Sequence, residues 1–138
     1  MSLAQIRKFH GHTGIWACIG FRAGKHAKRV LKPECIKDLT ADVYLNYQIP
    51  YSCALDGVQL SSCCTTGKKN LNVHDSDVEM SFVFLNKKTD KFIKLKPSKE
   101  VLTEIEIRQK MGSKETEEED SAWILKLAVT KLFDVVKK

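Results

Sequence analysis

The sequence lacks an apolar run that approaches the roughly 20 residues needed to cross a membrane. It also lacks a convincing export signal, because the apolar segment 14–21 is short and ends at Arg22 without a small-residue cleavage site. Its five cysteines are an odd number, which argues against a complete disulfide framework. We therefore predict a cytoplasmic protein with reduced thiols and no association with a membrane.

The basic segments of the sequence lack the aromatic interleaving that would suggest a platform for stacking bases. The net charge of +6 could attract nucleic acid, because clustered Lys and Arg displace counterions from phosphates. A platform for stacking bases, however, needs aromatic side chains among the cations. A solvated, solubilising surface is the simpler interpretation, and we expect no nucleic-acid partner.

What the sequence does contain fits one compact domain, since 138 residues with 43% hydrophobic content can bury a core. The polar and apolar pattern predicts alternating helices and strands with no internal repeat. The predicted elements are a helix over 15–31 stopped before Pro33, a strand over 41–49, a helix capped by Ser52 and ending near Cys63 or Cys64, strands at 71–73, 79–85 and 92–95, and a helix from Ser98 to about Met111 stopped by Gly112.

The last segment, 115–138, has an acidic start and a basic end, which complement a helix dipole. Leu125, Val129, Leu132 and Val136 form an apolar stripe with helical period. The fold class predicted is α+β, with an antiparallel or mixed sheet packed with helices and a C-terminal amphipathic helix. We expect a core over residues 1–100 and a helical extension over 101–138 that packs on the core or on a dimer partner.

His10 and His12 are separated by a single glycine. Two imidazoles at this spacing can aim at one point if the backbone is extended or turned, and imidazole binds zinc, nickel, copper or iron. The isolated pattern fits ordinary hydrogen-bonded histidines equally well. The pair is therefore a candidate metal site that needs a further ligand.

A second group comprises Cys53, Asp56, Gln59 and Cys64. Cys53 lies at the predicted start of a helix, where the positive end of the dipole lowers a thiol pKa, although a cysteine packed as a small hydrophobe is the alternative. A straight helix would hold Cys53 and Cys64 roughly 16 Å apart at 1.5 Å per residue, too far to share one ion. Either the helix breaks early, or Cys53 joins the histidines while Cys64 serves another site, a partner protein or the core.

Three blocks in this order and spacing resemble the formylmethanofuran dehydrogenase E-subunit-like family over about residues 5 to 100. The blocks are 9–12 with Gly20 and Arg22, 53–56 with Gln59, and 64–71. The resemblance implies an α+β fold, self-association, and a cleft that binds a transition metal, often zinc. It further implies His10, His12, Cys53 and Cys64 as metal ligands, with Asp56 and Gln59 supporting them or facing a substrate.

The sequence departs from the family pattern in two places. Relatives typically carry Cys-Pro-Gly after the histidine pair, whereas this chain has Gly14-Ile15-Trp16, so one thiol is missing. The cysteine-rich C-terminal zinc ribbon of some relatives is also missing.

The leading hypothesis is a metal-binding accessory or enzyme-like domain in which His10, His12 and Cys53 hold a divalent transition ion, expected to be zinc. A position left open on that ion would take water or a small-molecule ligand. One alternative is a thiol-based enzyme without metal, with Cys53 as the nucleophile and a nearby histidine as the base. The candidate catalytic residues are Cys53 and Asp56. Another is a non-catalytic protein-interaction role, and the homodimer implied by the family fits any of the three. The sequence does not decide whether the chain is an enzyme.

Overall fold

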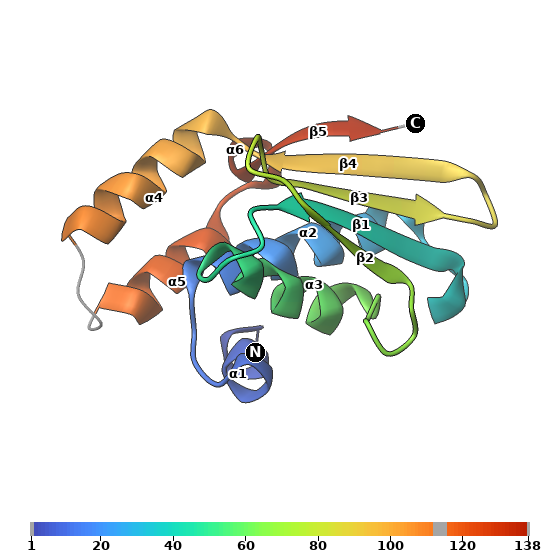
Figure 1. Ribbon diagram of the computed structural model, residues 1–138, viewed down its shortest axis with the longest axis horizontal. Coiled ribbons are helices and arrows are strands. Elements are labelled where there is room, and N and C mark those ends of the chain that lie inside the picture. The colour runs from blue at the N-terminus through green and yellow to red at the C-terminus, as the bar shows by residue number, and fades with distance from the viewer. Residues whose placement is uncertain (1, 112–115, 138) are drawn as a thin grey trace.

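Five strands form one mixed sheet in the order β2-β1-β3-β4-β5 (Figure 1). The computed structural model describes residues 2–111 and 116–137. The strands are β1 (Leu39–Leu45), β2 (Leu71–Asp75), β3 (Ser81–Asn86), β4 (Lys91–Pro97) and β5 (Phe133–Lys137). β1 and β2 are parallel, and the other three neighbouring pairs are antiparallel. The α+β class with a mixed sheet is thereby confirmed.

The helices gather mainly on one side of this sheet, below it in the view of Figure 1. They are α1 (Ser2–His10), α2 (Ile15–Leu31), α3 (Ala54–Ser62), α4 (Lys99–Met111), α5 (Glu117–Lys126) and α6 (Val129–Leu132), with short 3-10 turns η1 (Ile36–Asp38) and η2 (Tyr51–Cys53). Alternation along β1 buries Leu39, Ala41, Val43 and Leu45. Together with Phe82 and Phe84 of β3, they belong to the core that also includes α2.

α2 occupies the residues predicted for it, 15–31. It ends where Lys32 adopts a left-handed conformation, with φ 45°, and donates its backbone N–H to the carbonyl of Lys28. Pro33 follows, and a proline disfavours helical geometry in the residue before it. Local sequence therefore fixes this helix at its C-terminal end.

α2 and α3 pack with their backbones in contact. A Cβ atom added to Gly20 of α2 would lie 1.9 Å from the carbonyl oxygen of Ala54 in α3. Only a residue without a side chain permits this approach. Gly20, one of the residues that carry the family resemblance, thus sets how closely the first turn of α3 packs against α2.

Two local predictions need correction. Ser52 does not cap α3, because it lies inside η2, and the N-cap residue is Cys53 with no side-chain capping bond. The strand predicted over 41–49 is β1, which begins at Leu39 and already ends at Leu45. Residues 46–49 continue the alternation of apolar and polar residues but form no strand. The chain turns there and leads into η2. Gly112, the predicted stop of α4, lies outside the described residues.

The C-terminal amphipathic helix predicted over 115–138 is shorter than expected. α5 ends at Lys126, because Leu127 and Ala128 are both extended, with ψ 143° and 144°. Residues 133–137 then form β5, antiparallel to β4, with Phe133 opposite Pro97. Pairing with the edge of β4 satisfies backbone groups of β5 and suits its β-branched Val135 and Val136. The last strand, β5, therefore belongs to the same sheet as strands β1 to β4 of the first hundred residues.

None of the helices within the described ranges is both long and apolar enough to cross a membrane.

Candidate metal centre

The histidine pair lies at the end of α1 and in the turn after it. His10 is the last residue of α1, and Gly11 follows with a φ of 94°, a left-handed value that glycine adopts without strain. The N–H of Gly11 donates to the carbonyl of Arg7 at 2.9 Å and closes the helix. The turn brings the ring of His12 back beside that of His10, with ring centroids 4.6 Å apart. Of the extended and turned backbones that would bring the two rings together, the structure has the turned one.

His10 is held by a carboxylate of α3. Its Nδ1 atom lies 2.5 Å from Oδ2 of Asp56, in the first turn of α3. The side chain of His10 is only 9% exposed, and its Nε2 atom is buried without a hydrogen-bond partner. A carboxylate on Nδ1 favours the tautomer with the proton on Nδ1, which leaves the lone pair on Nε2. His10 therefore offers a buried, unengaged nitrogen donor.

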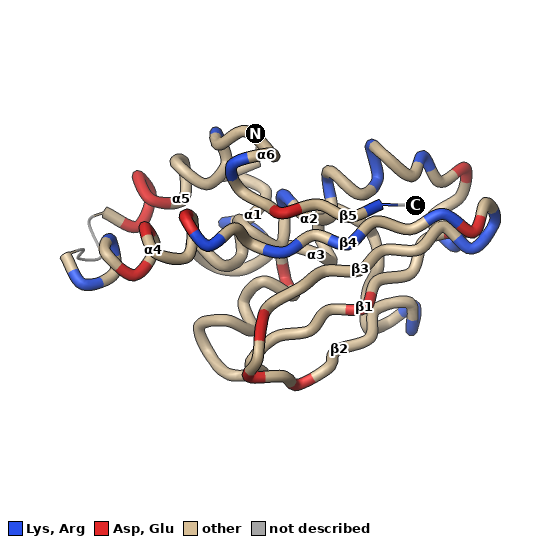
Figure 2. Tube along the Cα trace, turned by 90° about the horizontal axis from the view of Figure 1, so that it is seen from above, with Lys and Arg blue, Asp and Glu red and all other residues tan. Residues whose placement is uncertain are grey.

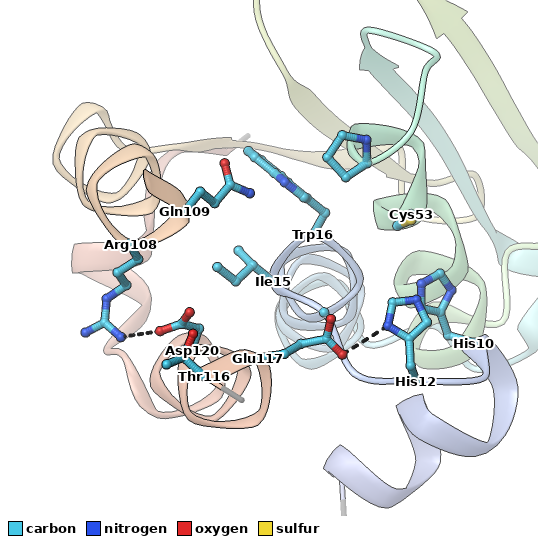
Figure 3. A pocket seen from close by; sticks show the side chains of 12 residues that line it. His10, His12, Ile15, Trp16, Cys53, Arg108, Gln109, Thr116, Glu117 and Asp120 are labelled. Atoms are coloured by element: carbon cyan, nitrogen blue, oxygen red, sulfur yellow. Dashed lines mark hydrogen bonds and ion pairs between the residues drawn. The ribbon is translucent and has the colours of Figure 1, made fainter. Parts of the chain in front are cut away.

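His12 has a similar arrangement with a distant residue. Its Nδ1 atom lies 3.1 Å from Oε1 of Glu117, the first residue of α5 (Figure 3). The hydroxyl of Thr13 donates to the same carboxylate oxygen at 3.3 Å. This pair is more exposed than the first, and again Nε2 of the ring is left for another partner. Both imidazoles are oriented through Nδ1.

The two histidines line a cavity of about 250 Å³. The residues around it are His10, His12, Gly14, Ile15, Trp16, Pro50, Cys53, Arg108, Gln109, Thr116, Glu117 and Asp120. Figure 3 shows the histidines and Cys53 on one side, and Arg108 and Asp120 across the opening. Nη1 of Arg108 donates to Oδ1 of Asp120 at 2.7 Å, and its guanidinium stacks 4.1 Å from the ring centroid of Trp123. These contacts join α4 to α5 and form the far wall.

Cys53 contributes a thiol to the same cavity from the start of α3. Burial, followed by the negative charge of Asp56, raises the pKa of this thiol above its ordinary value. The prediction of a lowered pKa was therefore wrong in direction: a backbone hydrogen bond does lower the pKa, but the two opposing effects outweigh it.

Cys64 lies elsewhere. α3 runs unbroken to Ser62, and Cys63 ends it with a φ of 63°. Cys64 is fully buried, its Sγ lies 3.5 Å from the carbonyl oxygen of Leu39, and it does not line the histidine cavity. Of the two arrangements left open by the spacing, the structure has Cys53 beside the histidines and Cys64 in the core.

Gln59 faces a neighbouring hollow rather than the histidine cavity. Its side-chain oxygen accepts hydrogen bonds from the backbone and the hydroxyl of Thr66, at 3.2 and 3.5 Å. It thereby ties the loop after α3 to the helix. This second cavity, of about 280 Å³, is also lined by His10, Cys53 and Asp56, so these three side chains lie between the two openings.

The donor set fits a transition metal in kind, with two oriented imidazoles and one thiol on the same cavity. Within residues 2–111 and 116–137, no group of three or more His, Cys, Asp or Glu side chains is already gathered at metal-binding distances. The assembled part of the donor set is the histidine pair, and the buried, unpartnered Nε2 of His10 is the observation that points to a ligand.

Sequence reasoning missed Glu117, Arg108 and the indole of Trp16. In the sequence pattern Glu117 belongs only to the acidic start of a helix, and 105 residues separate it from His12. Trp16 is 7% exposed, lines the cavity, and has a buried Nε1 without a hydrogen-bond partner. No local pattern in one sequence links these residues to the histidines, because the links exist only after folding.

Comparison with known proteins shows the family and the fold. The family model described as FmdE, molybdenum formylmethanofuran dehydrogenase operon, matches residues 9–136. The chain is similar in fold to the crystal structure of an FmdE-like protein of tungsten formylmethanofuran dehydrogenase from Syntrophus aciditrophicus, with a TM-score of 0.62 and 20% identity over 99% of this chain and 69% of that one. No curated protein matches the sequence. Because the family model covers most of the chain, the protein belongs to the FmdE family.

Proposed function

We propose that this chain is a transition-metal-binding domain, accessory to an enzyme or enzyme-like itself, in which His10, His12 and Cys53 hold one divalent ion. Zinc is the proposed metal, because an imidazole and thiolate donor set suits it. The observation that carries the proposal is the buried Nε2 of His10, which has no partner while Nδ1 is engaged by Asp56. A metal-ligating histidine usually donates its other nitrogen to a carboxylate in this way.

The chain's own residues have distinct parts in this proposal. Asp56 and Glu117 hold the two rings and their tautomers, and Cys53 supplies the third donor from the start of α3. When bound, a divalent ion with three protein ligands would supply Lewis acidity at its open position. The cavity of about 250 Å³ leaves room there for a small molecule, and the unpaired indole N–H of Trp16 could donate to an oxygen of that molecule.

The accessory part of this proposal is supported by the names of the proteins that the chain resembles. The description of the family names a molybdenum formylmethanofuran dehydrogenase operon. The similar solved structure is named as an FmdE-like protein of a tungsten formylmethanofuran dehydrogenase. We extend those names to this chain only as an association with such an enzyme system. A cytoplasmic location is part of the proposal and is supported by five cysteines that are all free.

Self-association as a homodimer is also proposed. The sheet face turned away from α2 and α3 carries half-buried Val83, Leu85 and Phe92, with the stacked rings of Tyr44 and His74 beside them. The face is mixed, because Val83 lies opposite Asp42 of β1 and Lys94 of β4. Its apolar side chains are the ones that a second chain would cover. Sedimentation equilibrium of the purified protein tests this part separately, and a monomer at micromolar concentration would contradict it.

The metal proposal is tested by elemental analysis of protein purified without added chelator. We expect about one equivalent of zinc for the wild type, as one site requires, and a loss of most of it in a His10→Ala/His12→Ala double variant. His74→Ala is the matched control, because His74 pairs with Asp42 on the sheet and touches neither cavity. Equal metal content in the double variant and the wild type would overturn the proposal.

A further inference from the structure

One face of α2 carries an unusual concentration of cations. Arg22, Lys25, His26 and Arg29 follow one another at helical spacing and line the same cavity of about 230 Å³. The other described residues that line it are Ser2, Phe21, Leu125 and Val129, and none of the lining residues is acidic. Figure 2 shows the Lys and Arg positions along the C-terminal half of α2. The cavity is distinct from the one beside the histidines.

The positive charges at this cavity have no carboxylate partner in the part of the chain that the structure describes. By contrast, Arg7 pairs with Glu118 and Arg108 pairs with Asp120. The Nη1–H group of Arg22 donates a hydrogen bond to the carbonyl of Ile124 at 2.7 Å, which fixes the side chain between α2 and α5. None of its other N–H groups pairs with a carboxylate of the described residues. A bound anion would supply the missing negative charge.

The pKa of His26 is affected by the same excess of positive charge. Burial, and then the charges of Arg29, Lys137 and Arg22, lower the pKa of His26 below its ordinary value. These cations come from two elements, α2 and β5, and the charge of each acts on the same imidazole. Like charges are brought together here at a cost that an anion between them would relieve.

Helix stabilisation alone does not account for the cluster. Cations in the last turn of a helix interact favourably with its dipole, which explains Lys28 and Arg29. Arg22 and Lys25 lie earlier in α2, where that interaction has faded. Lys28 lies between Lys25 and Arg29 in the sequence but does not line this cavity. The face that lines the cavity thus has cations beyond those the dipole favours.

We propose that this cavity binds the phosphate group of a small organic phosphate. Arginine is suited to phosphate because its guanidinium can donate two parallel hydrogen bonds, and Lys25 adds a point charge. Phe21, Leu125 and Val129 give the cavity an apolar wall against which a non-polar group next to the phosphate can pack. The volume is below the roughly 300 to 1,000 Å³ of pockets for drug-sized molecules, so the ligand is a small one.

The test uses phenyl phosphate as the probe, titrated into the full chain by calorimetry at constant ionic strength. We expect saturable binding to one site, tighter than that of inorganic phosphate because of the apolar wall. A Lys25→Gln/Arg29→Gln variant should bind about tenfold more weakly or worse, since two charge-assisted contacts are lost. Both residues are exposed, so the fold is expected to be kept, and Arg22 is left in place for its contact with α5.

A Lys68→Gln/Lys69→Gln variant is the matched control, because it removes the same charge from a loop outside the cavity. The ring of His26, followed by NMR, should titrate at higher pH when phenyl phosphate is bound, whereas the ring of His74 should not respond. No saturable binding, equal weakening in both variants, an unmoved His26 titration, or inorganic phosphate binding as tightly as the ester would each overturn the proposal. Metal content is unaffected by any of these outcomes, so the result is independent of the proposed metal centre.

Discussion

Nδ1 of His10 lies 2.5 Å from Oδ2 of Asp56, although 46 residues separate them. The contact joins the end of α1 to the first turn of α3. It fixes the ring whose other nitrogen is buried and unpartnered. The position of α3 that makes this contact possible depends in turn on the close approach of Gly20 to Ala54.

We expect Asp56→Asn to weaken zinc binding by about 10- to 100-fold, the range typical when a carboxylate behind a metal-binding histidine is lost. The amide can still hydrogen-bond but no longer increases the basicity of the ring. Competition with a chromophoric chelator measures the affinity. Asp42→Asn is the control, because Asp42 makes the same kind of contact, 2.9 Å to Nε2 of His74, away from the cavity. An affinity equal in both variants would contradict the role assigned to Asp56.

Glu117→Gln should also weaken zinc binding, by about tenfold, at the lower end of that range. The reason for the smaller effect is that His12 and Glu117 are both partly exposed, with 57% and 41% of their side chains accessible. Solvent therefore screens this pair more than the first. Glu118→Gln is the matched control, because the neighbouring carboxylate instead pairs with Arg7 at 3.4 Å. The same competition assay applies, and an unchanged affinity in Glu117→Gln would show that α5 has no part in the site.

These two carboxylates also show where sequence reasoning succeeds and where it stops. α2 was predictable because its boundaries depend on local signals, above all Pro33. Asp56 was a candidate from its place beside Cys53 in the sequence, and the family resemblance implied its supporting role. Glu117 was not, because its contact with His12 spans 105 residues and no period in the sequence encodes it. The strand at 133–137 was missed for a related reason, since its partner is β4 and the apolar spacing alone fits a helix.

The buried thiol of Cys18 makes stability depend on pH. Burial raises its pKa from 9.0 to about 11, so the folded state favours the neutral thiol. The unfolded chain ionises first, and stability that is fully present below pH 9.0 is lost as the pH rises towards 11. We expect this loss to be about 2–3 kcal/mol, from about 1.4 kcal/mol per unit of pKa. Urea unfolding at pH values from about 8 to 11, around those pKa values, measures the free energy of unfolding. For Cys18→Ala, this free energy should change less with pH than for the wild type. Cys35→Ala, at an exposed position, should keep the wild-type profile.

Gly20→Ala should destabilise the fold by about 1–3 kcal/mol, the usual cost of overpacking a core. The added methyl would lie 1.9 Å from the Ala54 carbonyl oxygen, and a backbone atom cannot move aside as a flexible side chain can. Urea unfolding measures the change. In Gly67→Ala the added atom meets only Thr65, at 4.0 Å, so this variant should stay close to the wild type. Equal stabilities would mean that α2 and α3 can separate slightly without loss.

Gly14 is the position at which the family resemblance implies a cysteine, and the structure has space for one. Its φ of −178° is extended, and an added Cβ would contact only Cε1 of His12, at 3.7 Å, within the cavity that both line. We therefore expect Gly14→Cys to bind zinc about tenfold more tightly or better, because a further thiolate donor would join the site. Gly14→Ser is the matched control, with similar size but no thiolate. With cobalt in place of zinc, the cysteine variant should show a stronger thiolate-to-cobalt absorption band than the wild type. An affinity and a band that match the wild type, or an equal gain in Gly14→Ser, would mean that this position does not face the metal.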